Sequence, residues 1–191
     1  MTRRGWLVTG MMMAASTVCW GAEERLTVVL LDTVGISQVG DVAELGRRFF
    51  QSVGVESNWT VCRSVESCTL PPKGTYVRVS LVDWKKGKIL GFANMQAAAG
   101  GSPQVYVFHP RTSELAAKAK HPLDRVIARV TVHEILHSLG LEHFPLGVMR
   151  ETVGGADLDS FLRGPALPSN QVKQLREGVS RLQPALVAAA Q

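Results

Sequence analysis

Three of the five histidines lie within eleven residues, in the stretch HEILHSLGLEH. His133 and His137 are four residues apart, which on a helix places both imidazoles on one face, one turn apart, within reach of one ion. Glu134 follows the first histidine and can accept a proton from a water that the ion activates. Gly140 can adopt the positive φ that ends a helix, and the turn would bring His143 back to the same ion. Three nitrogen ligands with a fourth position open are typical of a catalytic zinc site.

The alternative explanation is a helix with surface histidines and a C-capping glycine. It accounts for each residue separately but not for their joint spacing. The extended pattern H-E-x-x-H-x-x-G-x-x-H, followed by Gly147-Val148-Met149, resembles the zinc-binding signature of the metzincin metallopeptidases. The short distance from His143 to Met149 is most similar to matrixins and to small bacterial or archaeal metzincins.

The metzincin resemblance implies a Zn²⁺ cofactor and hydrolysis of peptide bonds in a polypeptide substrate. Glu134 would be the general base, and Met149 would form a tight turn beneath the metal without binding it. The implied metal ligands are His133, His137 and His143. Two other functions stay open, namely a zinc hydrolase of a non-peptide amide such as a cell-wall bond, and a catalytically silent secreted zinc-binding module. The intact Glu134 argues against the silent module.

The first 22 residues are typical of a secretory signal peptide. Arg3 and Arg4 form a basic start, and the apolar stretch over residues 6–18 is too short for a comfortable membrane span. The alternative is an uncleaved N-terminal anchor. We therefore predict an exported protein, secreted or periplasmic, and a length of 191 residues favours a single catalytic domain over residues 23–191.

Export changes the charge and the cysteine count. Loss of Arg3 and Arg4 would reduce 21 basic residues to 19 against 16 acidic ones, so the net charge falls from +5 to +3. The remaining basic residues are scattered, which argues against a nucleic-acid partner. We also expect no stable membrane association after cleavage and a monomer. Cys62 and Cys68 would remain, and an even count in an oxidising compartment favours a disulfide between them over two free thiols.

The hydrophobic pattern predicts the elements that must position these residues. Five strands are expected over residues 25–31, 58–65, 75–82, 89–95 and 104–108. Helical spacing is found over residues 41–53, with Asp41 as the N-cap, over 123–139, and from 169 onward. The expected order has no helix between residues 108 and 123, and residues 150–160 are expected to be loose and polar. Together with the resemblance, this predicts an α+β, metzincin-like fold: a mixed, twisted sheet backed by two helices, a zinc cleft, and a short C-terminal subdomain with one helix.

One predicted strand has a possible role in substrate binding. Gly91, Phe92 and Ala93 resemble the edge strand that lines the substrate cleft of matrixins. An extended peptide can pair its backbone with such an edge while alternate side chains enter pockets. The alternative is an ordinary edge hairpin. Arg150 and Glu151 stand where astacin-like and serralysin-like metzincins present a tyrosine on the metal side, so the resemblance implies that this group is absent.

Overall fold

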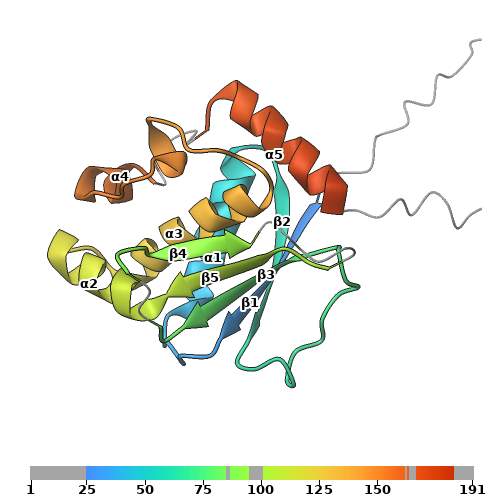
Figure 1. Cartoon of the computed structure of the whole chain (residues 1–191), viewed down its shortest axis with the longest axis horizontal. Coiled ribbons are helices and arrows are strands. Elements are labelled where there is room, and N and C mark those ends of the chain that lie inside the picture. The colour runs from blue at the N-terminus through green and yellow to red at the C-terminus, as the bar shows by residue number, and fades with distance from the viewer. Residues whose placement is uncertain (1–24, 85–86, 95–100, 162, 164–166, 183–191) are drawn as a thin grey trace, which may run out of the picture.

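Five strands form one mixed sheet with the order β2-β1-β3-β5-β4 (Figure 1). The computed structural model describes residues 25–84, 87–94, 101–161, 163 and 167–182. Neighbouring strands are parallel from β2 to β5, and β4 pairs antiparallel with β5. The strands are β1 (Arg25–Asp32), β2 (Glu56–Cys62), β3 (Val77–Val82), β4 (Gly91–Asn94) and β5 (Gln104–Phe108). The predicted mixed sheet of about five strands is confirmed, and the signal-peptide prediction lies outside the described residues.

Five α-helices and one 3₁₀ turn accompany the sheet in the described part of the chain. They are α1 (Val39–Ser52), α2 (His109–Ala119), α3 (Leu123–Ser138), η1 (Gly147–Met149), α4 (Gly155–Ser160) and α5 (Ser169–Leu182). The predicted helices correspond to α1, α3 and α5. The N-cap prediction for Asp41 is wrong, because α1 begins two residues earlier and Asp41 lies in its first turn, where its charge favours the helix dipole. No helix among these is long and apolar enough to cross a membrane.

The main core lies between one face of the sheet and helices α1 and α3. Alternate residues of the strands point into it, as expected for a period of two. Leu30 of β1, Val79 of β3 and Val107 of β5 are fully buried, and Phe50 of α1 and Ile135 of α3 pack in the same cluster. Burial of each such side chain contributes about 1.5–3 kcal/mol. Packing against the sheet and α1 therefore holds helix α3 along most of its length.

The opposite face of the sheet carries a smaller apolar cluster. Val29 and Leu31 of β1 pack there with Cys62 and Tyr76. Cys62 and Cys68 form a disulfide in the structure, with their α-carbons 5.5 Å apart. The bond joins the end of β2 to the loop that follows it.

Helix α2 was absent from the expected element order. Pro110 lies in its first turn, and Lys120 ends it with a left-handed backbone (φ 55°). Its weak apolar pattern explains why helical spacing did not reveal it: Thr112 and Ala116 are its only buried residues. Ala116 packs against Val126 of α3. The helix thus supports the N-terminal half of α3 from outside the main core.

Helix α4 is the second correction, since residues 150–160 were expected to be loose. The Asp157 carboxylate accepts a hydrogen bond from the Gly154 N–H at 2.8 Å and so caps this short helix. Leu158 is 1% exposed and joins the cluster of Ala116 and Val126. One local capping interaction and one long-range apolar contact therefore order a segment whose composition suggests a loop.

Helix α5 fixes the C-terminal end of α3. Gly178 lies so close to it that a Cβ at this position would be 2.6 Å from the Leu139 carbonyl oxygen. Arg181 Nη2 donates to the same oxygen at 2.9 Å, which satisfies a carbonyl that the helix end leaves without an intrahelical partner. The chain turns sharply at the next residue, Gly140, with the predicted positive φ of 95°.

Candidate metal centre and cleft

Three histidine side chains converge next to helix α3. His133 and His137 lie one turn apart on the helix, and the turn at Gly140 returns His143 to the same place. One ring nitrogen from each residue lies within 4.8 Å of the other two. The three histidines differ in exposure: His133 is buried, His137 is half-buried and His143 is exposed. One side of the centre is therefore packed in protein and the other is open to a substrate.

Two backbone carbonyls determine the tautomers of the helical histidines. His133 Nδ1 lies 2.8 Å from the Val148 oxygen, and His137 Nδ1 lies 2.7 Å from the Leu141 oxygen. Because a carbonyl can only accept, both Nδ1 atoms must carry the proton and donate. Each neutral ring then has its lone pair on Nε2, which is the form that a metal ion requires.

The two Nε2 atoms face one another at 3.1 Å. Two lone pairs at this distance repel unless a cation or a proton lies between the rings. Protonation is disfavoured, because burial lowers the pKa of His133 to about 3 and also lowers the pKa of His137. The donor set and its orientation thus fit a divalent metal ion that favours imidazole nitrogen, as Zn²⁺ does.

Glu134 follows His133 on α3 and lines the same cavity as the three histidines, with 8% of its surface exposed. Burial raises the pKa of its carboxyl to about 7, and the positive charge of Arg129 opposes this shift. Strand β4 packs directly on this side chain: a Cβ at Gly91 would be 3.0 Å from Glu134 Cγ and 2.7 Å from the Tyr106 carbonyl oxygen. Only glycine permits this approach, so the strand and the carboxylate lie side by side.

A cleft of about 790 Å³ runs between β4 and the three histidines. Strand β4 and the residues before it form one wall, and helix α3 and residues 151–153 form the others. β4 is the last strand of the sheet on this side, and no further strand of the described chain pairs with it. The predicted edge residues Gly91, Phe92 and Ala93 therefore lie along the cleft that contains the histidines.

The pairing of β4 shows which backbone groups face the open edge. The Phe108 N–H donates to the Leu90 oxygen at 2.8 Å, and the register places Gly91 opposite Val107 and Ala93 opposite Val105. In an antiparallel pair the residues alternate between hydrogen-bonded and non-hydrogen-bonded positions. The backbone groups of Gly91 and Ala93 therefore point away from β5 and toward the edge, where an extended peptide could pair with them.

Met149 lies where the resemblance places it, in the tight turn η1 after the third histidine. Its side chain is fully buried, and its carbonyl accepts a hydrogen bond from the Phe144 N–H at 2.9 Å. This bond closes the short loop that begins next to His143. The preceding residue supplies the carbonyl that orients His133, so the turn also helps to position a ligand.

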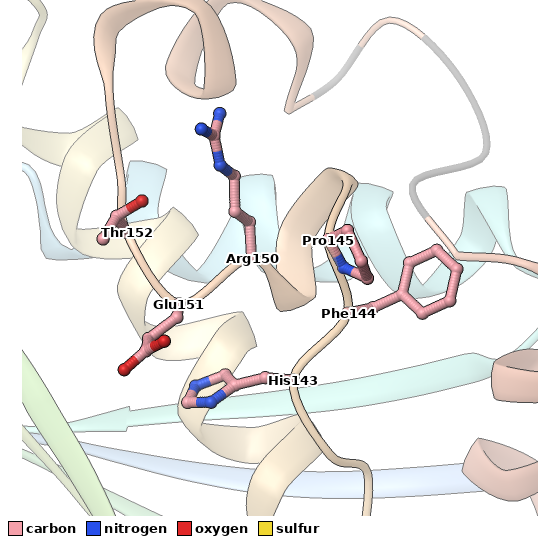
Figure 2. A pocket seen from close by; sticks show the side chains of 6 residues that line it. All are labelled: His143, Phe144, Pro145, Arg150, Glu151 and Thr152. Atoms are coloured by element: carbon pink, nitrogen blue, oxygen red, sulfur yellow. The ribbon is translucent and has the colours of Figure 1, made fainter.

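A smaller hollow of about 350 Å³ lies beside the third histidine (Figure 2). The Glu151 carboxylate and the His143 ring are on the same side of it, whereas Arg150 extends away from them (Figure 2). The Arg150 guanidinium lies 3.4 Å from Asp157 of α4.

Some site features could not be found from the sequence. The carbonyls of Leu141 and Val148 are backbone groups that any residue type would provide, so no sequence signal identifies them. Arg129 lines the cleft and is 1% exposed. Its spacing, four residues before His133, could have revealed it, because residues four apart on a helix share a face.

Comparison with known proteins identifies the fold. No family model and no curated protein matches the sequence. The solved structure of archaemetzincin from Methanopyrus kandleri aligns with a TM-score of 0.52 at 16% identity, covering 85% of this chain and 99% of that one. A zinc-dependent peptidase from Methanocorpusculum labreanum aligns with a TM-score of 0.50 at 14% identity, covering 78% and 99%. The chain therefore has the fold of these archaeal proteins, whereas the specific resemblance to matrixins stays a prediction.

Proposed function

We propose that this protein is a zinc-dependent endopeptidase. The observation that carries the proposal is the convergence of three imidazoles, two of which have Nδ1 fixed by a carbonyl and Nε2 facing inward. The fold adds support, because one protein that shares it is a zinc-dependent peptidase. A cleft bordered by an edge strand suits a polypeptide held in extended form, and this favours peptide bonds over other amides.

In this proposal His133, His137 and His143 hold the ion, and a bound Zn²⁺ would polarise the scissile carbonyl and activate the attacking water. The carbonyls of Val148 and Leu141 keep the two helical rings in their binding orientation. The edge backbone of Gly91 and Ala93 pairs with the substrate and aligns its scissile bond with the histidines.

Glu134 is the general base of the proposed reaction. Its carboxylate accepts the proton of the attacking water and then delivers it to the nitrogen of the leaving amine as the C–N bond breaks. Its side chain lies between β4, which would hold the substrate, and the histidines, which would hold the ion. The absence of a side chain at Gly91 leaves room for Glu134 in this position.

The test is cleavage of a mixed-peptide library by the zinc-loaded protein beside the Glu134→Ala variant, with metal content measured for both. We expect one zinc per chain in each and cleavage only by the wild type. A variant that cleaved at near wild-type rate would show that Glu134 is not the base. If neither protein cleaved the library and both had bound zinc, the same samples would be tested on peptidoglycan fragments. Hydrolysis of these fragments would show that the substrate is a cell-wall amide and not a polypeptide. Zinc binding without any hydrolysis would favour the silent binding module.

We also propose that the chain is exported and that residues 1–22 are removed. The basic start and short apolar stretch support this, and so does a disulfide, which persists in oxidising compartments. Mass spectrometry of the protein recovered outside the cytoplasm would test it. We expect an N-terminus near residue 23, and recovery of the full-length chain only from the cytoplasm would contradict export.

A further inference from the structure

One charged side chain of the cleft has no role in the reaction proposed above. Arg129 is 1% exposed and forms part of the cleft wall. Its Nη2 donates a long hydrogen bond, 3.3 Å, to the Gly147 oxygen. Its Nη1 is buried and has no hydrogen-bond partner among the described residues.

A buried guanidinium is normally paired with a carboxylate, because removing its charge from water without compensation is costly. Burial lowers the pKa of Arg129 to about 10, while the negative charges of Asp157 and Glu134 oppose the shift. The group is therefore still charged at neutral pH. Asp157 accepts from Gly154 and lies beside Arg150, and no described carboxylate forms a hydrogen bond with the Nη1 donor.

The position of Arg129 relates this donor to the reaction. Arg129 precedes His133 by four residues, so both line the same face of α3, about 6 Å apart along the helix axis. Arg129 contacts Gly147, and the same cleft is also lined by Leu115, Val130 and Val153. Because Arg129 is about one helical turn from His133, a substrate group that reached it would belong to a residue close to the scissile bond.

We propose that Arg129 binds a carboxylate of the substrate and makes this enzyme selective for it. The carboxylate is an Asp or Glu side chain that flanks the scissile bond, or the free α-carboxylate of a short peptide. The planar guanidinium matches a carboxylate with two parallel hydrogen bonds, and the match is strongest where water is excluded. This inference rests on the proposed peptidase function and adds its substrate class.

Cleavage rates measured on matched peptides test the selectivity. The zinc-loaded wild type is given one peptide frame with Asp, Glu, Asn, Gln or Ala on either side of the scissile bond, and a short frame with a free or amidated C-terminus. We expect a preference of roughly 10- to 100-fold in kcat/KM for the carboxylate over its amide, the range of a charge-assisted hydrogen bond. Preference for Asp and Glu would identify a side-chain carboxylate, and preference for the free terminus an α-carboxylate. Equal rates for every acid and its amide would overturn the proposal.

Variants of Arg129 test whether this residue causes the preference. Arg129→Gln should remove it, and Arg129→Lys should retain part of it. The matched control is Arg125→Gln, which removes the same charge from the same helix at a residue outside the cleft and should leave the preference intact. Zinc content and circular dichroism would check each fold. An unchanged preference in a folded Arg129→Gln would overturn the assignment, and if this variant did not fold, the Lys variant and the wild-type comparison would still decide.

Equilibrium binding separates this inference from the proposed function. The zinc-loaded Glu134→Gln protein, which should not turn over, is titrated by calorimetry with the Asp peptide, the Asn peptide, and the free and amidated short peptides. Tighter binding of a carboxylate peptide that is lost with Arg129→Gln would support the carboxylate site even if no cleavage were ever seen. Cleavage without any acid preference would leave the peptidase proposal standing and overturn this one.

Discussion

Substitution of Gly91 by alanine should reduce catalysis without removing the metal. The new Cβ would lie 2.7 Å from the Tyr106 carbonyl oxygen, 3.0 Å from Glu134 Cγ and 3.2 Å from Val130 Cγ1. The first contact is with backbone and cannot be relieved by a rotamer change, so β4 must move away from α3 or the Glu134 side chain must shift. Overpacking of this kind costs about 1–3 kcal/mol of stability. For a domain of this size the melting temperature should fall by roughly 2–4 °C per kcal/mol.

The effect on catalysis should exceed the effect on stability. A displacement of about 1 Å at a reacting group can cost roughly 10²-fold in rate. We therefore expect kcat/KM of Gly91→Ala to fall on the order of 100-fold in a peptide assay. One zinc should still bind per chain, because the three atoms nearest to the new Cβ belong to Tyr106, Glu134 and Val130 and not to a histidine.

Gly40→Ala is the matched control, since a Cβ at this position in α1 would meet no atom within 4 Å. It should keep full activity and gain a few tenths of a kcal/mol to about 1 kcal/mol from the higher helix propensity of alanine. Near wild-type activity of a folded, zinc-loaded Gly91→Ala would refute the idea that the close approach of β4 positions Glu134.

Three further predictions concern the metal centre and its support. Removal of zinc by a chelator should lower the melting temperature, since a ligand that binds only the folded state at about 1,000 times its Kd stabilises it by about 4 kcal/mol; an unchanged melting curve would contradict a tightly bound ion. The metal-free protein should lose stability in denaturant titrations as the pH falls from about 6.5 toward 3, by up to about 1.4 kcal/mol per pH unit. The reason is that His133 binds a proton in the unfolded chain, whereas burial lowers its pKa to about 3 in the folded chain and keeps the ring neutral. A free energy of unfolding that did not change over this pH range would show that the ring is not held neutral. Gly178→Ala should destabilise the fold by about 1–3 kcal/mol, because the new Cβ would lie 2.6 Å from the Leu139 carbonyl oxygen. Thermal denaturation of this variant beside the Gly40→Ala control would measure the loss of stability. An unchanged melting temperature would show that α5 packs loosely against the end of α3.

Hydrophobic periodicity was sufficient to predict the elements with large buried faces. Strands β1, β3 and β5 and helices α1, α3 and α5 each bury several large apolar side chains, so their periods are visible in the sequence. Helix α2 buries only Thr112 and Ala116, and α4 buries only Leu158. Their order depends on capping groups and on contacts with α3, and a local pattern does not contain such contacts.

The chemistry of the centre was predictable in part. The spacing of His133, His137 and Gly140 is local, and the helix and turn follow from it directly. The position of β4 beside Glu134 depends on strand order, which is a long-range property. The unpaired state of Arg129 likewise depends on which segments fold around it, and so only the structure reveals it.

The most direct test of the central claim is a titration of the metal-free protein with zinc, in which peptide cleavage and bound zinc are measured on the same samples. The account predicts that activity is absent without zinc, rises in proportion to the bound ion, and stops rising at one zinc per chain. Cleavage at full rate without zinc, or one bound zinc per chain with no hydrolysis of any peptide in a broad library, would contradict a zinc-dependent peptidase.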